Sequence, residues 1–238
     1  MTAPTPYPPK VVARPVMLQR WSWLTFIHWR YDPAVIERLL PPALECDTFD
    51  GSAWVGLVPF YIPQLNIASL PSVPWACTFP ETNVRTHVRG PEGRTGIWFF
   101  TLEAARLLAV IGARLTYRLP YRWAAMSVSK QGNIVEYRSR RLPPFGKGET
   151  NLAMEISATR DWGDFDFFLT ARFRLYTAHR GRVAFADVEH RPWPLQTAHA
   201  LRLDQDLVEM SGVPKPSGAP VLHYSEDLLV KVDRLRWL

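Results

Sequence analysis

The chain has 238 residues, of which 47% are hydrophobic and 21% are charged. This balance excludes disordered and fibrous proteins and predicts a globular fold with a sizeable core. The formal net charge of +6 at pH 7 comes mainly from arginines that are scattered along the chain, which argues against nucleic-acid binding.

Residues 1–15 contain five prolines and little apolar material, so we expect a flexible segment ahead of a single domain over residues 16–238. The first residues lack the apolar core of a signal peptide, and no apolar run approaches the roughly 20 residues of a membrane span. Cys46 and Cys77 form no CxxC pair, and the sequence alone does not establish a disulfide between them. We therefore expect a cytoplasmic protein without membrane contact.

The first third of the chain alternates between strand-like segments and breaks. Residues 17–30 and 52–63 are rich in aromatic and β-branched residues, which predicts two strands, the first of them buried on both faces. Asp32 and Pro33 open a short amphipathic helix that ends before Pro41. The proline-rich residues 67–80 predict a long loop, of the kind that often carries function.

A hairpin and a helix follow. Residues 82–89 alternate in polarity, a Gly-Pro-Glu-Gly turn comes next, and residues 95–101 return as a second strand. Residues 102–115 are apolar on most sides and predict a buried helix with Thr101 as its cap.

The remainder predicts an antiparallel meander. Strand-like segments with glycine-containing turns between several of them cover residues 124–130, 133–140, 152–160, 165–178, 182–190 and 228–235. Many strands, two short-to-medium helices and no βαβ rhythm predict a mainly β (α+β) fold. Its core would be a closed or strongly curved antiparallel sheet around an internal pocket.

Candidate chemistry is limited by the motifs that are missing. The sequence has no HExxH, GxxxxGK[ST], GxGxxG or GxSxG motif, so we expect no metal site and no cofactor. Polar residues do occur inside the apolar strands, where burial is costly unless they are paired or used: they are His28, Arg30, Glu81, Arg85, His87 and Glu103. The residues alone favour a structural ion pair between Glu81 and an arginine, and leave a pocket role open.

Several ordered segments resemble the YqjF-like family of bacterial proteins, domain of unknown function 2071. They include His28–Pro33 (HWRYDP), Phe79–His87 (FPETNVRTH), Gly96–Glu103 (GIWFFTLE) and His190–Leu195 (HRPWPL), and the resemblance extends over about residues 15–235. The family is similar in its expected fold to acetoacetate decarboxylase, whose cone-shaped antiparallel barrel encloses a small pocket. This implied fold agrees with the fold class that the sequence pattern predicts.

The resemblance also carries expectations about the pocket. In acetoacetate decarboxylase, a lysine of a Pro-Lys-Lys segment forms a Schiff base with a β-keto acid, assisted by a pocket arginine and a pocket glutamate. By motif, Arg30 resembles that arginine and Glu81 resembles that glutamate. Here Pro120 is followed by Tyr121 and Arg122, and a guanidinium cannot serve as a neutral amine nucleophile. We therefore do not expect Schiff-base decarboxylation.

Three functions remain open. We rank first an enzyme without a covalent imine, an isomerase, dehydratase or lyase for a small keto or hydroxy acid, with Glu81 and Tyr121 as catalytic groups. Its substrate-binding residues would be Arg30, Arg85, His28, His87 and Arg122. The second is a protein that binds a small organic acid without turnover. The third is a structural or interaction protein whose polar residues only close the barrel; a homo-oligomer is compatible with all three.

Overall fold

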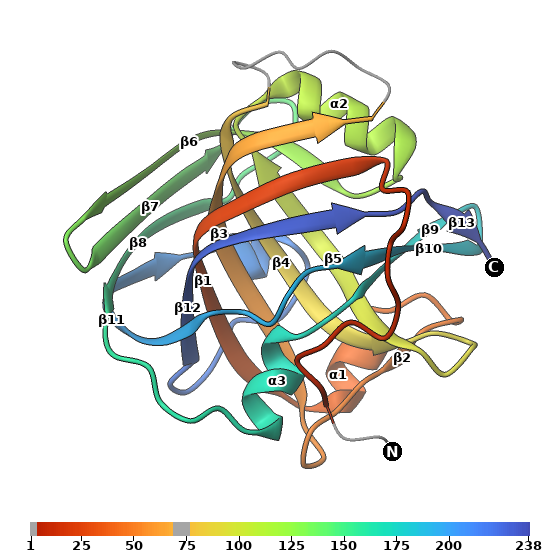
Figure 1. Cartoon of the computed structure of the whole chain (residues 1–238), viewed down its shortest axis with the longest axis horizontal. Helices are drawn as coiled ribbons and strands as arrows, with labels where there is room; N and C mark the ends of the chain where they lie inside the picture. The colour runs from red at the N-terminus through yellow and green to blue at the C-terminus, as the bar shows by residue number, and fades with distance from the viewer. Residues whose placement is uncertain (1–3, 69–76) are drawn as a thin grey trace.

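The computed structural model describes residues 4–68 and 77–238, and Figure 1 shows strands wrapped into a barrel with short helices at its rims. The four helices of the described part are α1 Pro33–Glu37, α2 Leu107–Thr116, α3 Asp164–Thr170 and α4 Leu207–Met210. Its thirteen strands are β1 Met17–Tyr31, β2 Glu45–Cys46, β3 Ala53–Ile67, β4 Phe79–Arg89, β5 Thr95–Ala104, β6 Tyr121–Gln131, β7 Ile134–Arg141, β8 Glu149–Ile156, β9 Arg174–His179, β10 Arg182–Glu189, β11 Leu195–Gln205, β12 Val221–Val232 and β13 Arg236–Trp237. The expectation of a mainly β fold is confirmed, although with more helices than predicted.

Five antiparallel strands, in the order β12, β1, β3, β4 and β5, form a wall that two rings of strands share. On one side β6, β7, β8 and β11 lead from β5 back to β12 and complete a closed barrel of 9 strands. On the other side β9 and β10 connect β5 to β12 through short pairings, closing a smaller ring. The shared wall therefore has an interior on each face.

Residue alternation assigns the side chains of this wall to the two interiors. Ile27, Val55 and Val84 face the larger barrel, where they pack with Tyr137 and Leu152. Their neighbours along the same strands face the smaller ring, where Leu24, Phe26, Val58 and Phe60 pack together. Since successive strand residues point to opposite faces, the side chains on both faces of a strand between two interiors are buried. Residues 24–29 of β1 are all buried, which confirms the predicted burial of this strand on both faces.

The helix predicted at 102–115 differs from the helix that forms. Residues up to Ala104 continue β5, because β4 pairs with them to that point, and α2 begins only at Leu107. Thr101 is not its cap; the hydroxyl of Thr101 donates to Glu103 Oε1 at 2.9 Å. The helix is also less buried than expected: of its residues only Val110 is fully buried, while Leu108 and Leu115 are 58% and 63% exposed.

The C-terminal meander has the predicted character with local differences. The segment predicted as one strand at 165–178 divides into α3 and β9, because Asp166 accepts the Gly163 N–H and so favours a helical turn. The strand β11 was not predicted, and β12 begins earlier than expected.

Most of the predicted loop 67–80 lies outside the described residues, and β3 and β4 reach Ile67 and Phe79 on either side of it. In the N-terminal segment, Val12 is buried and its N–H donates to Glu189 Oε2 at 2.5 Å.

Within the described residues, no helix is long and apolar enough to span a membrane.

Candidate functional site

One face of β4 carries a row of buried polar side chains. Glu81, Asn83, Arg85 and His87 occupy alternate positions, so they point into the same interior, and none is more than 5% exposed. This is the interior of the smaller ring, because their cross-strand neighbours Val58 and Phe60 belong to its apolar cluster.

His28 of β1 lies beside this row, with Gly56 of β3 between them. Gly56 of β3 pairs with His28 on one side and with Arg85 on the other. A Cβ at Gly56 would lie 2.7 Å from Nε2 of His28, so the imidazole lies over the position that a side chain would fill. The strand register sets His28 and Arg85 at the same level of the interior, and the missing side chain at Gly56 leaves room there for the imidazole.

Arg85 is a buried cation that forms no ion pair with the residues that the structure describes. Its Nε and Nη2 atoms are buried and have no hydrogen-bond partner in the described structure. The ring of Phe26 lies 5.2 Å from its guanidinium carbon, and that aromatic contact is a weak substitute for water or a carboxylate. Burial, and then the charge of Arg172, lower the pKa of Arg85 to about 9.

His28 and His87 lie side by side with their ring centroids 5.5 Å apart. Both are fully buried, and none of their four ring nitrogens has a side-chain partner in the described part. Burial lowers the pKa of both far below the ordinary value, assisted by Arg85 at His28 and by Arg172 at His87. Each is therefore a neutral imidazole near pH 7, with one donor and one acceptor nitrogen.

Glu81 forms a second, distinct part of the row. Tyr121 pairs with Leu102 of β5, which in turn pairs with Asn83 of β4, and this register brings the Tyr121 hydroxyl within 2.9 Å of Glu81 Oε2, to which it donates. Burial raises the pKa of Glu81 to about 8, although the hydrogen bond from Tyr121 acts in the opposite direction. Burial and then Glu81 raise the pKa of Tyr121 well above its ordinary value.

This arrangement bears on the ion pair that the residues alone favoured. In the described residues Glu81 has no salt bridge to an arginine, and its side chain accepts a hydrogen bond from the Tyr121 hydroxyl instead. A carboxyl group with a pKa near 8 is largely protonated at neutral pH. The predicted pairing of Glu81 with an arginine is therefore replaced by a pairing with a phenol.

Three further residues join this interior that the sequence did not indicate. His223 of β12 is fully buried, and its Nε2 lies 2.8 Å from Asp166 Oδ1, which leaves Nδ1 without a partner in the described structure. Burial acts to raise the pKa of Asp166, but hydrogen bonds from His223, the Gly163 N–H and Arg160 outweigh it and hold the value at about 2. No local motif could have linked side chains that lie 57 positions apart in the sequence.

The third of these residues, Arg172, follows α3 and differs from Arg85 in having a partner. Its Nη1 donates to Asp47 Oδ2 at 2.7 Å, and its Nε donates to the Phe168 carbonyl. We use the term inner polar cluster for the residues that line this interior: His28, Glu81, Asn83, Arg85, His87, Tyr121, Asp166, Arg172 and His223. Within the described residues, no group of three histidine, cysteine or acidic side chains could hold a metal ion.

Two residues predicted to bind substrate lie elsewhere. Arg30, two positions beyond His28, reaches the end of the strand, where it is exposed and donates from Nε to the Ser52 hydroxyl at 2.5 Å. Arg122 follows Tyr121 and therefore points to the opposite face of β6, where Nη1 donates to the Phe145 carbonyl at 3.3 Å. The expectation that these arginines join the pocket is corrected: the sequence motif gave the right strands but not the face or depth of each side chain.

All five lysines of the chain lie in the described ranges, and all lie outside the inner polar cluster. Lys130 and Lys231 form ion pairs with Glu226 and Glu189, and Lys10 contacts Asp187. The other two, Lys147 and Lys215, are exposed. None of the five amines belongs to the inner polar cluster.

Comparison with known proteins adds a family and a fold. The model of the DUF2071 family, described as an uncharacterized conserved protein, matches residues 18–228. Uncharacterized protein YqjF of Bacillus subtilis (strain 168) is 37% identical over 226 residues, which cover 93% of this chain and 90% of YqjF.

Two solved structures illustrate the fold. The enduracididine biosynthesis enzyme MppR complexed with pyruvate aligns with a TM-score of 0.67 at 13% identity, covering 99% of this chain and 98% of that one. Acetoacetate decarboxylase from Legionella pneumophila aligns with a TM-score of 0.66 at 11% identity, covering 98% of this chain and 92% of that one. Likeness at these identities shows the fold, and the expected acetoacetate decarboxylase-like barrel is confirmed.

Proposed function

This chain belongs to the DUF2071 family, and we propose that it is an enzyme that acts on a small keto or hydroxy acid without forming a covalent imine. The inner polar cluster would hold the acid and move a proton on it. The reaction class that fits is isomerisation, dehydration or non-covalent decarboxylation.

The observation that carries the proposal is the buried, unpartnered edge of Arg85. Taking a guanidinium out of water costs several kcal/mol unless an anion compensates for it. The two unpartnered nitrogens, Nε and Nη2, form the side of the guanidinium that matches the two oxygens of a carboxylate. A small carboxylic acid therefore supplies the charge and both acceptors that Arg85 lacks.

The strand geometry relates this anion site to the proton-transfer groups. Arg85 and Glu81 are four residues apart on one face of β4, so their Cα atoms are separated by about 13 Å at a rise of about 3.3 Å per residue. Both side chains extend into the same interior, and the unpartnered Oδ1 of Asn83 lies between them in the row. An acid held by its carboxylate at Arg85 would extend its remaining atoms toward Asn83 and Glu81.

Glu81 is suited to move a proton because its pKa of about 8 keeps both forms populated near neutral pH. In the ionised form it would remove a proton from the carbon next to a carbonyl group, and the electron pair would move to the carbonyl oxygen. The neutral N–H group of His28, which lies level with Arg85 across Gly56, would stabilise the resulting enolate oxygen. Return of the proton from Glu81, hydrogen-bonded to Tyr121, would complete the transfer.

One structural neighbour, MppR, is described in complex with pyruvate, which is a keto acid of the size proposed here. That likeness concerns the fold, so the choice of a keto acid for this chain depends on its own Arg85 and Glu81. Binding of an acid without turnover uses the same Arg85 and is separated from catalysis by experiment.

The test combines binding with proton exchange. Pyruvate, 2-oxobutyrate and lactate are screened by thermal shift, and exchange of the protons next to the carbonyl of pyruvate is followed by NMR in D₂O. We expect the wild type to be stabilised and to accelerate exchange. Glu81→Gln should retain binding and lose exchange, and Arg85→Met should lose both.

Arg30→Gln is the matched control, because it removes an arginine that lies outside the inner polar cluster and should behave like the wild type. Stabilisation without exchange in the wild type would identify a binding protein. If none of the acids stabilised the wild type and no exchange were accelerated, the proposal would be rejected.

A further inference from the structure

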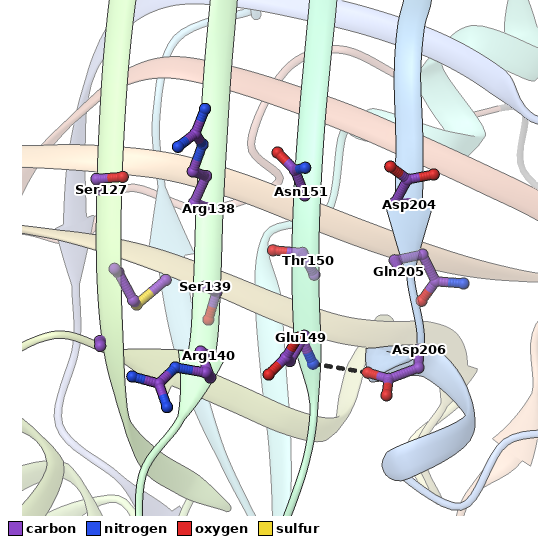
Figure 2. Close-up of a pocket in the computed structure, with 12 residues that line it drawn as sticks. Ser127, Arg138, Ser139, Arg140, Glu149, Thr150, Asn151, Asp204, Gln205 and Asp206 are labelled. Carbon is purple, nitrogen blue, oxygen red and sulfur yellow. Dashed lines mark hydrogen bonds between the residues drawn. The ribbon is translucent and has the colours of Figure 1, made fainter.

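The outward face of the strands β7, β8 and β11 carries two columns of charge. Figure 2 shows Arg138 and Arg140 on one strand and Asp204 and Asp206 two strands away, with Asn151 and Glu149 between them. The face is hollowed by an open cavity of about 860 Å³. It lies at the edge of the molecule away from the C-terminus (Figure 1).

The sheet register aligns the two columns in rows. Arg138 pairs with Asn151, and Asn151 pairs with Asp204. One row further, Arg140 pairs with Glu149, whose N–H donates to Asp206 Oδ1 at 2.6 Å.

A third row has the opposite polarity. Glu136 pairs with Ala153, and Ala153 pairs with Arg202. The β7 column therefore reads acid, base, base, from Glu136 to Arg140, while the β11 column reads base, acid, acid, from Arg202 to Asp206. In every row the two charges are opposite and lie at the same distance from β8.

Only one of these rows is neutralised within the chain. Arg202 Nη2 donates to Glu136 Oε1 at 2.8 Å across the small Ala153. Across the other rows the larger Asn151 and Glu149 intervene, and an aspartate reaches less far than a glutamate over the roughly 10 Å that separate alternate strands. Among the described residues, Arg138, Arg140 and Asp204 form no ion pair.

From this pattern we infer that the face joins two copies of this chain about a two-fold axis parallel to β8. A half-turn about such an axis places β7 of one copy over β11 of the other and leaves each row at its own level. Arg138 then meets the partner's Asp204, and Arg140 meets the partner's Asp206. Glu136 meets the partner's Arg202. In each of the three rows, two pairs of opposite charges therefore face each other across the interface.

The dimensions agree with this arrangement. Sheets packed face to face are about 10 Å apart, a gap that one extended arginine and one aspartate can span together. The axis passes over Ala153 and Asn151, which are small or neutral. Its one like-charge contact is Glu149 against the same residue of the second copy, beside the arginines of both chains.

The occupant follows from the symmetry of the pattern. A second copy requires equal and opposite columns in matching register on either side of one strand, as an isologous interface must provide. A different protein or a small charged molecule would require no such match. Charged contacts at an interface of this kind set specificity and are weakened by salt, so the dimer should dissociate as ionic strength rises.

The test uses charge reversal and recombination, read as mass by sedimentation velocity at low salt. Wild type should be dimeric and should shift toward monomer in high salt. Arg138→Glu with Arg140→Glu should be monomeric, because acids then meet acids. Asp204→Arg with Asp206→Arg should be monomeric for the converse reason. An equimolar mixture of the two double variants should recover a dimer, since every reversed residue then meets its opposite.

The control is Arg38→Glu with Arg191→Glu, which makes the same change in net charge at exposed arginines outside this face and should leave the dimer intact. Glu149→Gln should tighten the dimer several-fold by removing the like-charge contact. Circular dichroism shows that each variant is folded. A monomeric wild type, an assembly that both reversals leave unchanged, or a mixture that does not recover would each overturn the inference.

Discussion

Arg85 and Arg141 are both buried, at 5% and 6% exposure, and they face opposite interiors of the same fold. Arg141 uses Nε and Nη2 to donate to the carboxylate of Glu103, at 3.1 and 2.7 Å to Oε1, and its Nη1 donates to the Lys147 carbonyl. In Arg85 the same two nitrogens, Nε and Nη2, have no partner in the described structure. Burial alone therefore does not distinguish the structural Arg141 from Arg85, which we propose as a ligand-binding residue; the hydrogen bonds at the Nε and Nη2 edge of the guanidinium do.

The largest effect should come from removing the partner of Arg141. Glu103→Gln keeps the shape of the side chain but leaves a buried guanidinium uncompensated, and breaking a buried pair in this way costs about 3–5 kcal/mol. Urea unfolding of the variant and the wild type measures the difference in the free energy of unfolding. A loss below about 1 kcal/mol would show that water reaches Arg141 and would remove the contrast with Arg85.

The next effect depends on pH and involves Glu81. Its pKa is raised from 4.5 to about 8 in the folded state, so the folded protein binds more protons than the unfolded chain between those values. Stability from this group is full below about pH 4.5 and is lost as pH rises toward about 8, with a slope of up to about 1.4 kcal/mol per pH unit. Glu81→Gln should remove this slope, measured as unfolding free energy from pH 5 to 9. Parallel profiles for variant and wild type would contradict the raised pKa.

These two sites also show what the sequence can and cannot reveal. Alternation along 82–89 predicted that Arg85 and His87 share a face, and the Pro-Glu-Thr and Pro-Tyr segments indicated Glu81 and Tyr121 as candidates; the structure brings both pairs together. Strand periodicity says which residues share a face but not which interior that face meets. For this reason Arg122 was expected in the same pocket as Tyr121, although as the next residue of β6 it points to the opposite face.

Contacts between distant segments could not be predicted from the sequence for a related reason. The His223–Asp166 contact joins β12 to α3, and neither residue lies in a motif. Arg30 was predicted to lie in the pocket because its motif resembles that of the pocket arginine of acetoacetate decarboxylase, yet the strand leaves the interior before reaching it. Depth along a strand depends on where the barrel ends, which no local pattern encodes.

An intermediate effect is expected at Gly56, which separates Arg85 from His28. Gly56→Ala places a methyl group 2.7 Å from Nε2 of His28, and overpacking of this kind costs about 1–3 kcal/mol. The variant should also lose affinity for small acids, because the imidazole must move away from the row. Gly112→Ala on α2, where a Cβ meets nothing within 4 Å, is the matched control and should keep both stability and binding. Normal acid binding by Gly56→Ala would place the ligand away from His28.

The smallest effect on stability, and the sharpest on function, should come from Arg85 itself. Arg85→Met replaces an unpartnered buried cation by an apolar chain of similar length, so the free energy of unfolding should stay within about 1 kcal/mol of the wild type or rise. The same substitution at Arg141 leaves the buried carboxylate of Glu103 without its partner and should destabilise the protein strongly. If Arg85→Met proved as destabilising as Arg141→Met, Arg85 would be a structural residue. A stable Arg85→Met protein that no longer responds to any acid would instead identify the guanidinium edge as the ligand site, since its loss would remove binding and nothing that the fold requires.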